Sequence, residues 1–230
     1  PYITSKFDVF LSNEIMRPIV SQEKSSFNMR EIMDGRKILL VNLSKGRLGD
    51  INSHLIGLIL VGKILMAALS RVDSFGKGAD SMPDFYLYLD EFQNVTTDSI
   101  STILSEARKY RLALTVAHQF IGQLDDKIKN AVFGNVGSMA VFRVGTEDAE
   151  FLEKQFTPVF TQTDIVNLDN FNAYIRLLSG GRPAKPFNIR IMSKDVGNMA
   201  QVDKLKELSS LKFGRPRAEV EEEVMEKYRK

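Results

Sequence analysis

Two adjacent carboxylates, Asp90 and Glu91, follow directly after a short apolar run at residues 85–89. An apolar run of this length, rich in aromatic residues and preceded by Pro83, predicts a buried strand of a parallel sheet. Ligands of open parallel α/β sheets bind beyond the carboxyl ends of the strands. Successive side chains of a strand point to opposite sides, so one carboxylate can hold Mg²⁺ while the other activates an attacking water. We therefore assign Asp90 to Mg²⁺ and Glu91 to the general base.

The same pair also has a structural interpretation. Acidic side chains are favourable near helix N-termini, so Asp90 and Glu91 could simply begin the next helix. Short motifs of this kind also arise by chance. On the pair alone, both interpretations stay open.

Composition allows one large domain, or one domain with an appendage, because the chain has 230 residues, 43% of them hydrophobic and 26% charged. Zero cysteines exclude disulfides, iron–sulfur clusters and thiolate zinc sites, and two histidines are too few for a histidine-based metal centre. The formal net charge of +2 means that any contact with nucleic acid must come from local clusters of basic residues.

We expect no membrane contact by this segment, because Gly62 and Lys63 interrupt the apolar residues between Ile56 and Leu69 and leave too short a run. The chain begins at Pro1 without an initiator methionine or a signal sequence. That start leads us to expect a piece of a longer protein.

Strands and helices alternate along the chain. Helices are predicted at 7–20, 28–34, 52–71, 98–110, 125–133 and 146–156 with Thr146 as N-cap, and strands at 37–43, 85–89, 112–117 and 138–144. Such alternation predicts βαβ units and a mostly parallel sheet. Two later strands, 171–179 and 187–192, are joined by a turn at 180–183, which predicts an antiparallel hairpin at the sheet edge. Residues 216–230 predict a charged helix that is solvated or frayed.

The sequence lacks a recognisable phosphate-binding loop. Lys45 and Arg47 lie in a glycine-bearing loop at 44–50, but that loop lacks the G-x-x-x-x-G-K-[ST] spacing, and Gly76-Lys77-Gly78 is a linker. The missing loop would supply the backbone N–H cradle for phosphates. We therefore expect this piece to bind ATP weakly or not at all.

Four segments, at 38–49, 90–94, 117–119 and 142–149, together resemble the ATPase domain of conjugative coupling proteins. These proteins belong with the type IV secretion ATPases and the wider HerA/FtsK group of ring-forming DNA pumps. The resemblance covers roughly residues 32–191 and implies an α/β fold. This fold is a RecA-like P-loop NTPase core that is truncated at its N-terminal side. Its mostly parallel sheet is flanked by helices and carries an antiparallel edge hairpin. The implied division is a peripheral helical segment at 1–36, the core at 37–192 and a C-terminal helical tail at 193–230.

The resemblance implies roles for three polar residues. Asp90 matches the magnesium-associated Walker B acid, and Glu91 matches the residue that activates water. Gln119 matches a polar sensor of the γ-phosphate, since an amide at the end of an adjacent strand can bond both the attacking water and a phosphate oxygen. The alternative for Gln119 is a polar residue that merely begins a loop.

Basic residues complete the implied site. Arg108 lies where related ring ATPases place an arginine that reaches the neighbouring subunit's nucleotide, and Arg111 is the second candidate. A planar, permanently charged guanidinium suits a γ-phosphate, although both could belong to a solvated helix C-terminus. Arg143 is a candidate for phosphate or interface contact, or for a salt bridge. Lys45 and Arg47 are candidates for DNA or ring-interface contact, with a structural turn as the alternative.

On this resemblance the chain is a fragment of an ATP-driven, DNA-translocating motor. The full-length protein would use ATP and Mg²⁺ as a hexameric ring, contacting DNA and secretion or relaxosome proteins in the cytoplasm. Whether it is anchored at the inner face of the cell membrane stays open, and we expect the fragment alone to be inactive. A non-hydrolysing RecA-like docking module for DNA-processing proteins also stays open. A small-molecule enzyme is the third possibility, although the sequence holds no Ser-His-Asp or Cys-His cluster.

Overall fold

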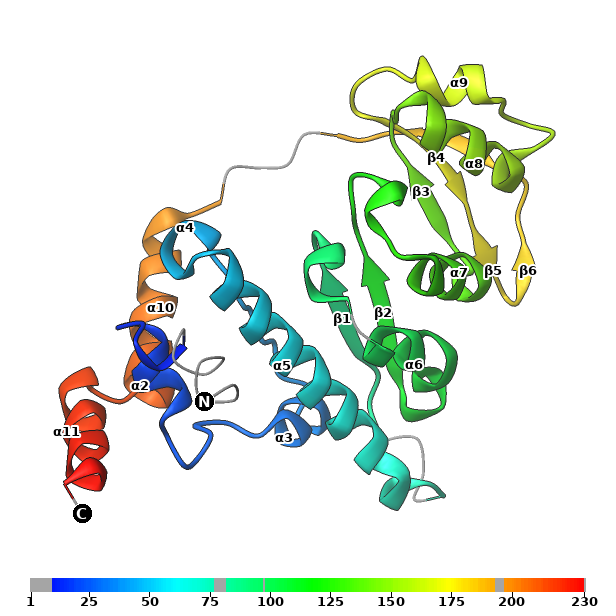
Figure 1. Ribbon diagram of the computed structural model, residues 1–230. Helices are drawn as coiled ribbons and strands as arrows, with labels where there is room; N and C mark the ends of the chain where they lie inside the picture. The colour runs from blue at the N-terminus through cyan, green and yellow to red at the C-terminus, as the bar shows by residue number, and fades with distance from the viewer. Residues whose placement is uncertain (1–9, 77–81, 97, 193–196, 230) are drawn as a thin grey trace. The chain divides into compact units, whose positions relative to one another are not determined.

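The computed structural model describes residues 10–76, 82–96, 98–192 and 197–229 (Figure 1). Two compact units are present, and each is described by itself: one is Pro1–Pro83 together with Val196–Lys230, and the other is Asp84–Asp195. Residues 7–9 of the first predicted helix and Lys77-Gly78 of the predicted linker lie outside the described ranges. The second unit carries Asp90 and Glu91.

The strand predicted beside these carboxylates forms as β1 (Phe85–Leu89) and pairs in parallel with β2 (Leu112–Val116). Alternate residues of β1 separate its two faces, since Leu87 is buried while Tyr86 and Tyr88 are exposed. Among the described residues, these two strands make up the whole parallel sheet. The α/β class is confirmed, but the parallel part is small.

Helices connect and flank these strands as predicted. Helix α6 (Asp98–Glu106) and the 3-10 turn η4 (Ala107–Tyr110) lead from β1 to β2, and α6 packs against β2. Helix α7 (Asp126–Asn135) follows the short 3-10 turn η5 (Ile121–Gln123) and packs against α6. Asp125 caps α7, because its side chain accepts a hydrogen bond from Ile128 N.

A second sheet has the strand order β3 (Met139–Val141), β4 (Asn172–Arg176) and β7 (Phe187–Arg190), and both pairings are antiparallel. The antiparallel pairing predicted after residue 170 is therefore confirmed, but its strands lie in a separate antiparallel sheet and not at the edge of the parallel one. Between its strands, β5 (Leu178–Ser179) and β6 (Arg182–Pro183) form a smaller hairpin. The prediction that placed β3 in a parallel sheet was wrong, because a short apolar run does not encode which distant strand it will pair with.

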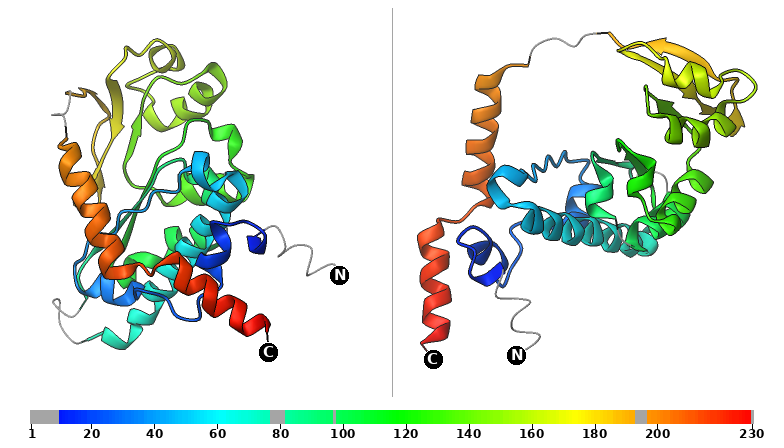
Figure 2. Two further views of the ribbon diagram at one scale, coloured as in Figure 1. Left: turned by 90° about the vertical axis from the view of Figure 1, so that its left-hand side faces the viewer. Right: turned by 45° about the horizontal axis from the view of Figure 1, so that its top comes forward.

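Helices α8 (Thr146–Phe156) and α9 (Gln162–Val166) cover one face of this second sheet (Figures 1 and 2). The core between them consists of Ile121, Val141, Ala149, Leu152, Phe156 and Ile165, all buried. Helix α8 occupies the predicted residues, but its N-cap is Gly145 and not Thr146. Helix α9 begins with a capping box between Thr161 and Asp164.

The first unit is built on helix α5 (Asp50–Leu69), which packs against α3 (Met29–Asp34) and α4 (Lys45–Leu48). The loop predicted at 44–50 is thus partly helical. The strand predicted at 37–43 was wrong: these residues have no regular structure, and Ile38 and Leu40 are 87% and 84% exposed. A strand needs a neighbour for its backbone N–H and C=O groups, and the described residues of this unit pair no strand with it.

Helix α5 and the 3-10 helix η1 (Ser70–Ser74) together span Asp50–Ser74. This is the one helix in the described ranges that is long and apolar enough to cross a membrane by length and composition alone, with a mean hydropathy of 2.0. The helix predicted at 52–71 is confirmed, with Gly62 and Lys63 inside it. The expectation that these two residues leave too short an apolar run was wrong by this measure of length and composition. Buried core helices share the same length and composition, and 39% of the apolar window is buried here.

Near the two ends of this unit's sequence, α2 (Met16–Val20) and α11 (Arg217–Tyr228) pack against each other. Asn13 interrupts the helix predicted at 7–20, because its side chain accepts from the backbone N–H groups at 15 and 16. Figure 2 shows α10 (Met199–Phe213) and α11 following one another along the chain. The charged helix predicted at 216–230 forms as α11, and most of its described residues are exposed. It is not solvated on every side, since Val220 and Val224 are buried.

Candidate functional site

Asp90 and Glu91 leave the sheet as a two-residue turn whose ends are both held by Ala117. Ala117 N donates to Leu89 O at 2.9 Å, and Phe92 N donates to Ala117 O at 3.0 Å. The side chain of Phe92 is completely buried, so the turn is anchored in the core on its far side. Irregular pairing of this kind at a strand end changes the direction in which the side chains of the turn residues point.

Glu91 has left-handed backbone angles, with φ 49° and ψ 46°. This conformation costs a residue other than glycine roughly 1–2 kcal/mol. Asp90 offsets part of the cost, because its Oδ1 accepts a hydrogen bond from Glu91 N at 3.0 Å. Strained backbone of this kind concentrates at functional sites, where the surrounding structure enforces it.

Two glutamine amides hold the Glu91 carboxylate, one on each oxygen. Gln119 Nε2 donates to Oε1 at 2.5 Å, and Gln93 Nε2 donates to Oε2 at 2.6 Å. The structure therefore brings Asp90, Glu91 and Gln119 together at the carboxyl ends of β1 and β2. Sequence reasoning assigned no role to Gln93; its place two residues after Glu91, directly after the predicted strand end, is the only signal that could have pointed to it.

His118 packs against Phe92, the buried anchor of the turn. Its ring meets the buried Phe92 ring edge to face, with 5.3 Å between centroids. Burial lowers the pKa of His118 from its ordinary value of 6.5, and the nearby carboxylates of Asp148 and Glu91 oppose this shift only in part. Asp148 in turn accepts from Ile121 N at 3.0 Å, which ties the loop after β2 to α8. His118 is therefore neutral at pH 7.

Replacing His118 by phenylalanine is expected to remove a pH-dependent part of the stability. The unfolded chain binds a proton on this histidine near pH 6.5, whereas the folded chain binds it only at lower pH. This stability contribution is thus complete above pH 6.5 and is lost as pH falls toward the folded pKa. Thermal unfolding between pH 8 and pH 5 should show a weaker loss of Tm on acidification for H118F than for the wild type. His54, which is exposed on α5, supplies the control variant H54Q, and equal slopes for H118F and the wild type would contradict the assignment.

Arg108 and Arg111 lie at the opposite edge of the parallel sheet. Arg111 Nη1 is 3.3 Å from Asp84 Oδ1, and Phe85 N donates to Arg111 O at 2.8 Å, at the amino ends of the strands. Arg108, in η4, is exposed beside the same edge. A strand of five residues is roughly 16 Å long, so neither arginine reaches Glu91 of its own chain.

The other basic candidates make local contacts with neighbouring polar side chains. Arg143 follows β3 and donates from Nη2 to Asn170 Oδ1 at 3.0 Å. Lys45 and Arg47 lie exposed on α4 in the first unit, and Lys45 Nζ is 3.5 Å from Asp50 Oδ1. These contacts agree with the salt-bridge and structural alternatives as well as with contacts to a ligand.

The residues present suit a magnesium ion but not a nucleotide by themselves. Among the described residues, no cluster of three or more His, Asp or Glu side chains could hold an ion. Mg²⁺, however, keeps several waters and is commonly held by one or two carboxylates together with substrate phosphates. Asp90 is exposed and could supply such a carboxylate. The sequence has no phosphate-binding loop to supply the rest.

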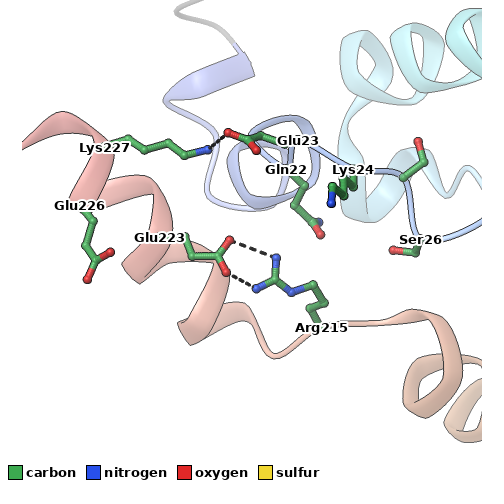
Figure 3. Close-up of a pocket in the computed structure, with 9 residues that line it drawn as sticks. Gln22, Glu23, Lys24, Ser26, Arg215, Glu223, Glu226 and Lys227 are labelled. Carbon is green, nitrogen blue, oxygen red and sulfur yellow. Dashed lines mark hydrogen bonds and ion pairs between the residues drawn. The ribbon is translucent and has the colours of Figure 1, made fainter. Parts of the chain in front are cut away.

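A cavity of about 580 Å³ lies in the first unit, between residues 22–26 and α11 (Figure 3). Figure 3 shows four of its charged side chains in two pairs, Glu223 with Arg215, and Lys227 Nζ with Glu23 Oε1 at 2.7 Å. The ion pair with Lys227 lowers the pKa of the exposed Glu23 carboxyl. None of the predicted site residues lines this cavity.

Comparison with known proteins connects the carboxylate site to one family. Residues 84–165 match a family model described as the TraM recognition site of TraD and TraG. No curated protein sequence matches the chain significantly.

Solved structures with a similar chain path include two of a bacterial plasmid coupling protein, TrwB. Its unbound form is 18% identical with a TM-score of 0.50, over 66% of this chain and 39% of TrwB. Its complex with the non-hydrolysable GTP analogue GDPNP is 19% identical with a TM-score of 0.49, over 60% and 37%. A genome packaging NTPase, B204 from Sulfolobus turreted icosahedral virus 2, in complex with AMPPCP, is 11% identical with a TM-score of 0.49, over 74% of each chain. The likeness to unbound TrwB shows a common fold, and this chain spans less than half of the TrwB length.

Proposed function

Since residues 84–165 belong to the TraD/TraG family, and the chain is a C-terminal part of a conjugative coupling protein, we propose that its parent is an ATP-driven motor that moves DNA. In this proposal, residues 37–192 are the part of a RecA-like P-loop NTPase core that follows the phosphate-binding loop. The observation that carries the proposal is the hydrogen bond between Gln119 and Glu91, across the carboxyl ends of two parallel strands.

Each site residue has a distinct task in this proposal. Glu91 accepts the proton of the attacking water, and its fixed carboxylate supplies the orientation that general-base catalysis needs. Gln119 holds one oxygen of Glu91 and can exchange this bond for one to a phosphate oxygen or to the water. Asp90 would hold Mg²⁺, which neutralises developing phosphate charge when it is bound.

The position of the arginines supports subunit assembly in this proposal. Arg108 and Arg111 lie at the sheet edge away from Glu91 of their own chain, so they can serve a nucleotide only in trans, as in a ring. We extend the proposal to a hexameric ring in the cytoplasm that binds DNA and relaxosome or secretion proteins. Lys45 and Arg47, exposed on α4, are candidates for the DNA contact, and Arg143 for a subunit contact.

Activity measurements on the two lengths of protein test the proposal. The full-length protein is expected to hydrolyse ATP in a Mg²⁺-dependent reaction that DNA stimulates. The present chain alone is expected to show no turnover, because it lacks the loop that cradles phosphates. Steady-state phosphate release, measured for both proteins with and without DNA, tests both expectations. Robust ATPase from the 230 residues alone would contradict our interpretation of the missing loop.

A second candidate function is a docking module for a DNA-processing protein. The description of the matched family, a recognition site for the protein TraM, favours it for residues 84–165. Partner binding by this chain without nucleotide, together with a full-length protein that lacks ATPase activity, would support docking over the motor.

A further inference from the structure

We infer that Gln93 is a positioning residue for water activation by Glu91, an inference that rests on the proposed hydrolytic function. Gln93 Nε2 donates to Glu91 Oε2 at 2.6 Å, on the carboxylate oxygen that Gln119 leaves open. Gln93 itself touches no substrate in this role. It acts by fixing the carboxylate through which the reaction would proceed.

The local fold explains why Gln93 can reach back to Glu91. The 3-10 helix η3 (Phe92–Val95) begins directly after Glu91, and Asn94 N donates to Glu91 O at 2.9 Å. This tight turn, with the buried Phe92 as its anchor, places the side chain of Gln93 beside that of Glu91. Thr96 Oγ1 donates to Gln93 O at 3.1 Å and holds the turn from the other side.

The amide of Gln93 can face the carboxylate in only one way. If its oxygen faced Glu91, two acceptors would repel each other, so Nε2 must point toward the carboxylate. The other end, Oε1, is then buried, and no described residue donates to it. A buried acceptor without a donor destabilises the fold. The fold therefore retains an unfavourable group in order to keep the donor on Glu91, as expected of a residue kept for function.

Together the two amides define the plane and direction of the carboxylate. Each oxygen of a carboxylate has about two acceptor positions, and Gln93 and Gln119 each occupy one of them on a different oxygen. The attacking water would bond to this same carboxylate, so its position would depend on the plane that the two amides fix. With one amide removed, the carboxylate can rotate about its last bond, and the water would no longer be held in the attacking geometry.

The test is Gln93→Leu in the full-length protein, which removes the donor and also the buried orphan oxygen while keeping a similar size. We expect kcat for ATP to fall on the order of 10–100-fold, since small misplacements of a catalytic group have effects of this size. The KM for ATP should stay within about twofold, because Gln93 does not bind the nucleotide. The Tm should be unchanged or higher. A purely structural role would instead lower Tm and leave kcat of the folded fraction intact.

Gln123→Leu is the matched control, because Gln123 is exposed in η5 of the same unit and should tolerate the change. If the wild type hydrolyses ATP and Glu91→Gln does not, yet Gln93→Leu retains wild-type kcat, the role of Gln93 is wrong and the proposed function survives. If the wild-type full-length protein shows no ATPase activity, the proposed function fails, and the role of Gln93 fails with it.

Discussion

Glu91→Gln is expected to abolish ATP turnover by the full-length protein while nucleotide binding persists. A neutral amide cannot accept the proton of the attacking water, and loss of a general base costs on the order of 10²–10⁴ in rate. The substitution also places an amide where Gln93 and Gln119 now donate to two carboxylate oxygens, so at least one of these bonds must be lost. Phosphate release at saturating ATP and DNA measures turnover, and titration with a fluorescent nucleotide measures nucleotide binding.

Glu150→Gln supplies the matched control for this experiment. Glu150 is an exposed glutamate on α8 in the same unit, so the same change of charge there should leave turnover near the wild-type value. Wild-type ATPase activity in the Glu91→Gln protein would overturn the assignment of Glu91 as the base. Loss of nucleotide binding together with turnover would instead point to a role in holding the nucleotide.

Asp34→Ala is expected to give the largest loss of stability in the first unit. Asp34 pairs with Arg71, whose side chain has no exposed surface, and both Nε and Nη2 of Arg71 lie 3.0 Å from Asp34 Oδ1. Removing the carboxylate takes this ion pair away from a buried guanidinium, which also donates from Nη1 to Pro83 O at 3.0 Å. Breaking a buried pair costs about 3–5 kcal/mol, and we expect about 3 kcal/mol because Asp34 is itself partly exposed. Urea unfolding followed by helical circular dichroism measures the loss.

Two further variants distinguish the contribution of the buried ion pair to stability from that of a nearby exposed carboxylate. Asp73→Ala removes a carboxylate that pairs with Arg30 at 2.9 Å but is 65% exposed, so its cost should stay below about 1 kcal/mol. The double change Asp34→Leu with Arg71→Met removes both charges and should recover most of the stability lost in Asp34→Ala. Equal stability of Asp34→Ala and the wild type would show that the pair does not hold α3 to η1.

The candidate site was predictable from the sequence where it depends on neighbouring residues along the chain. The strand at 85–89 formed with the two carboxylates directly after it, because a strand and its end are local features. The prediction that this strand is buried was wrong, since Tyr86 and Tyr88 are exposed and burial depends on which distant elements cover the strand. Gln119 could be placed because parallel strands bring their carboxyl ends to one edge. Gln93 could not, because its role depends on a tight turn whose geometry the residue types do not specify.

By itself, the sequence determined the α/β class, the positions of β1, β2 and the helices around them, and the meeting of Asp90, Glu91 and Gln119. Only the tertiary structure decided that 37–43 forms no strand, that β3 pairs antiparallel with β4, and that Arg108 and Arg111 lie at the far edge of the sheet. The physical reason is the same in each case. Helix and strand preferences are set by adjacent residues, whereas pairing depends on which distant backbone groups are present to accept and donate hydrogen bonds.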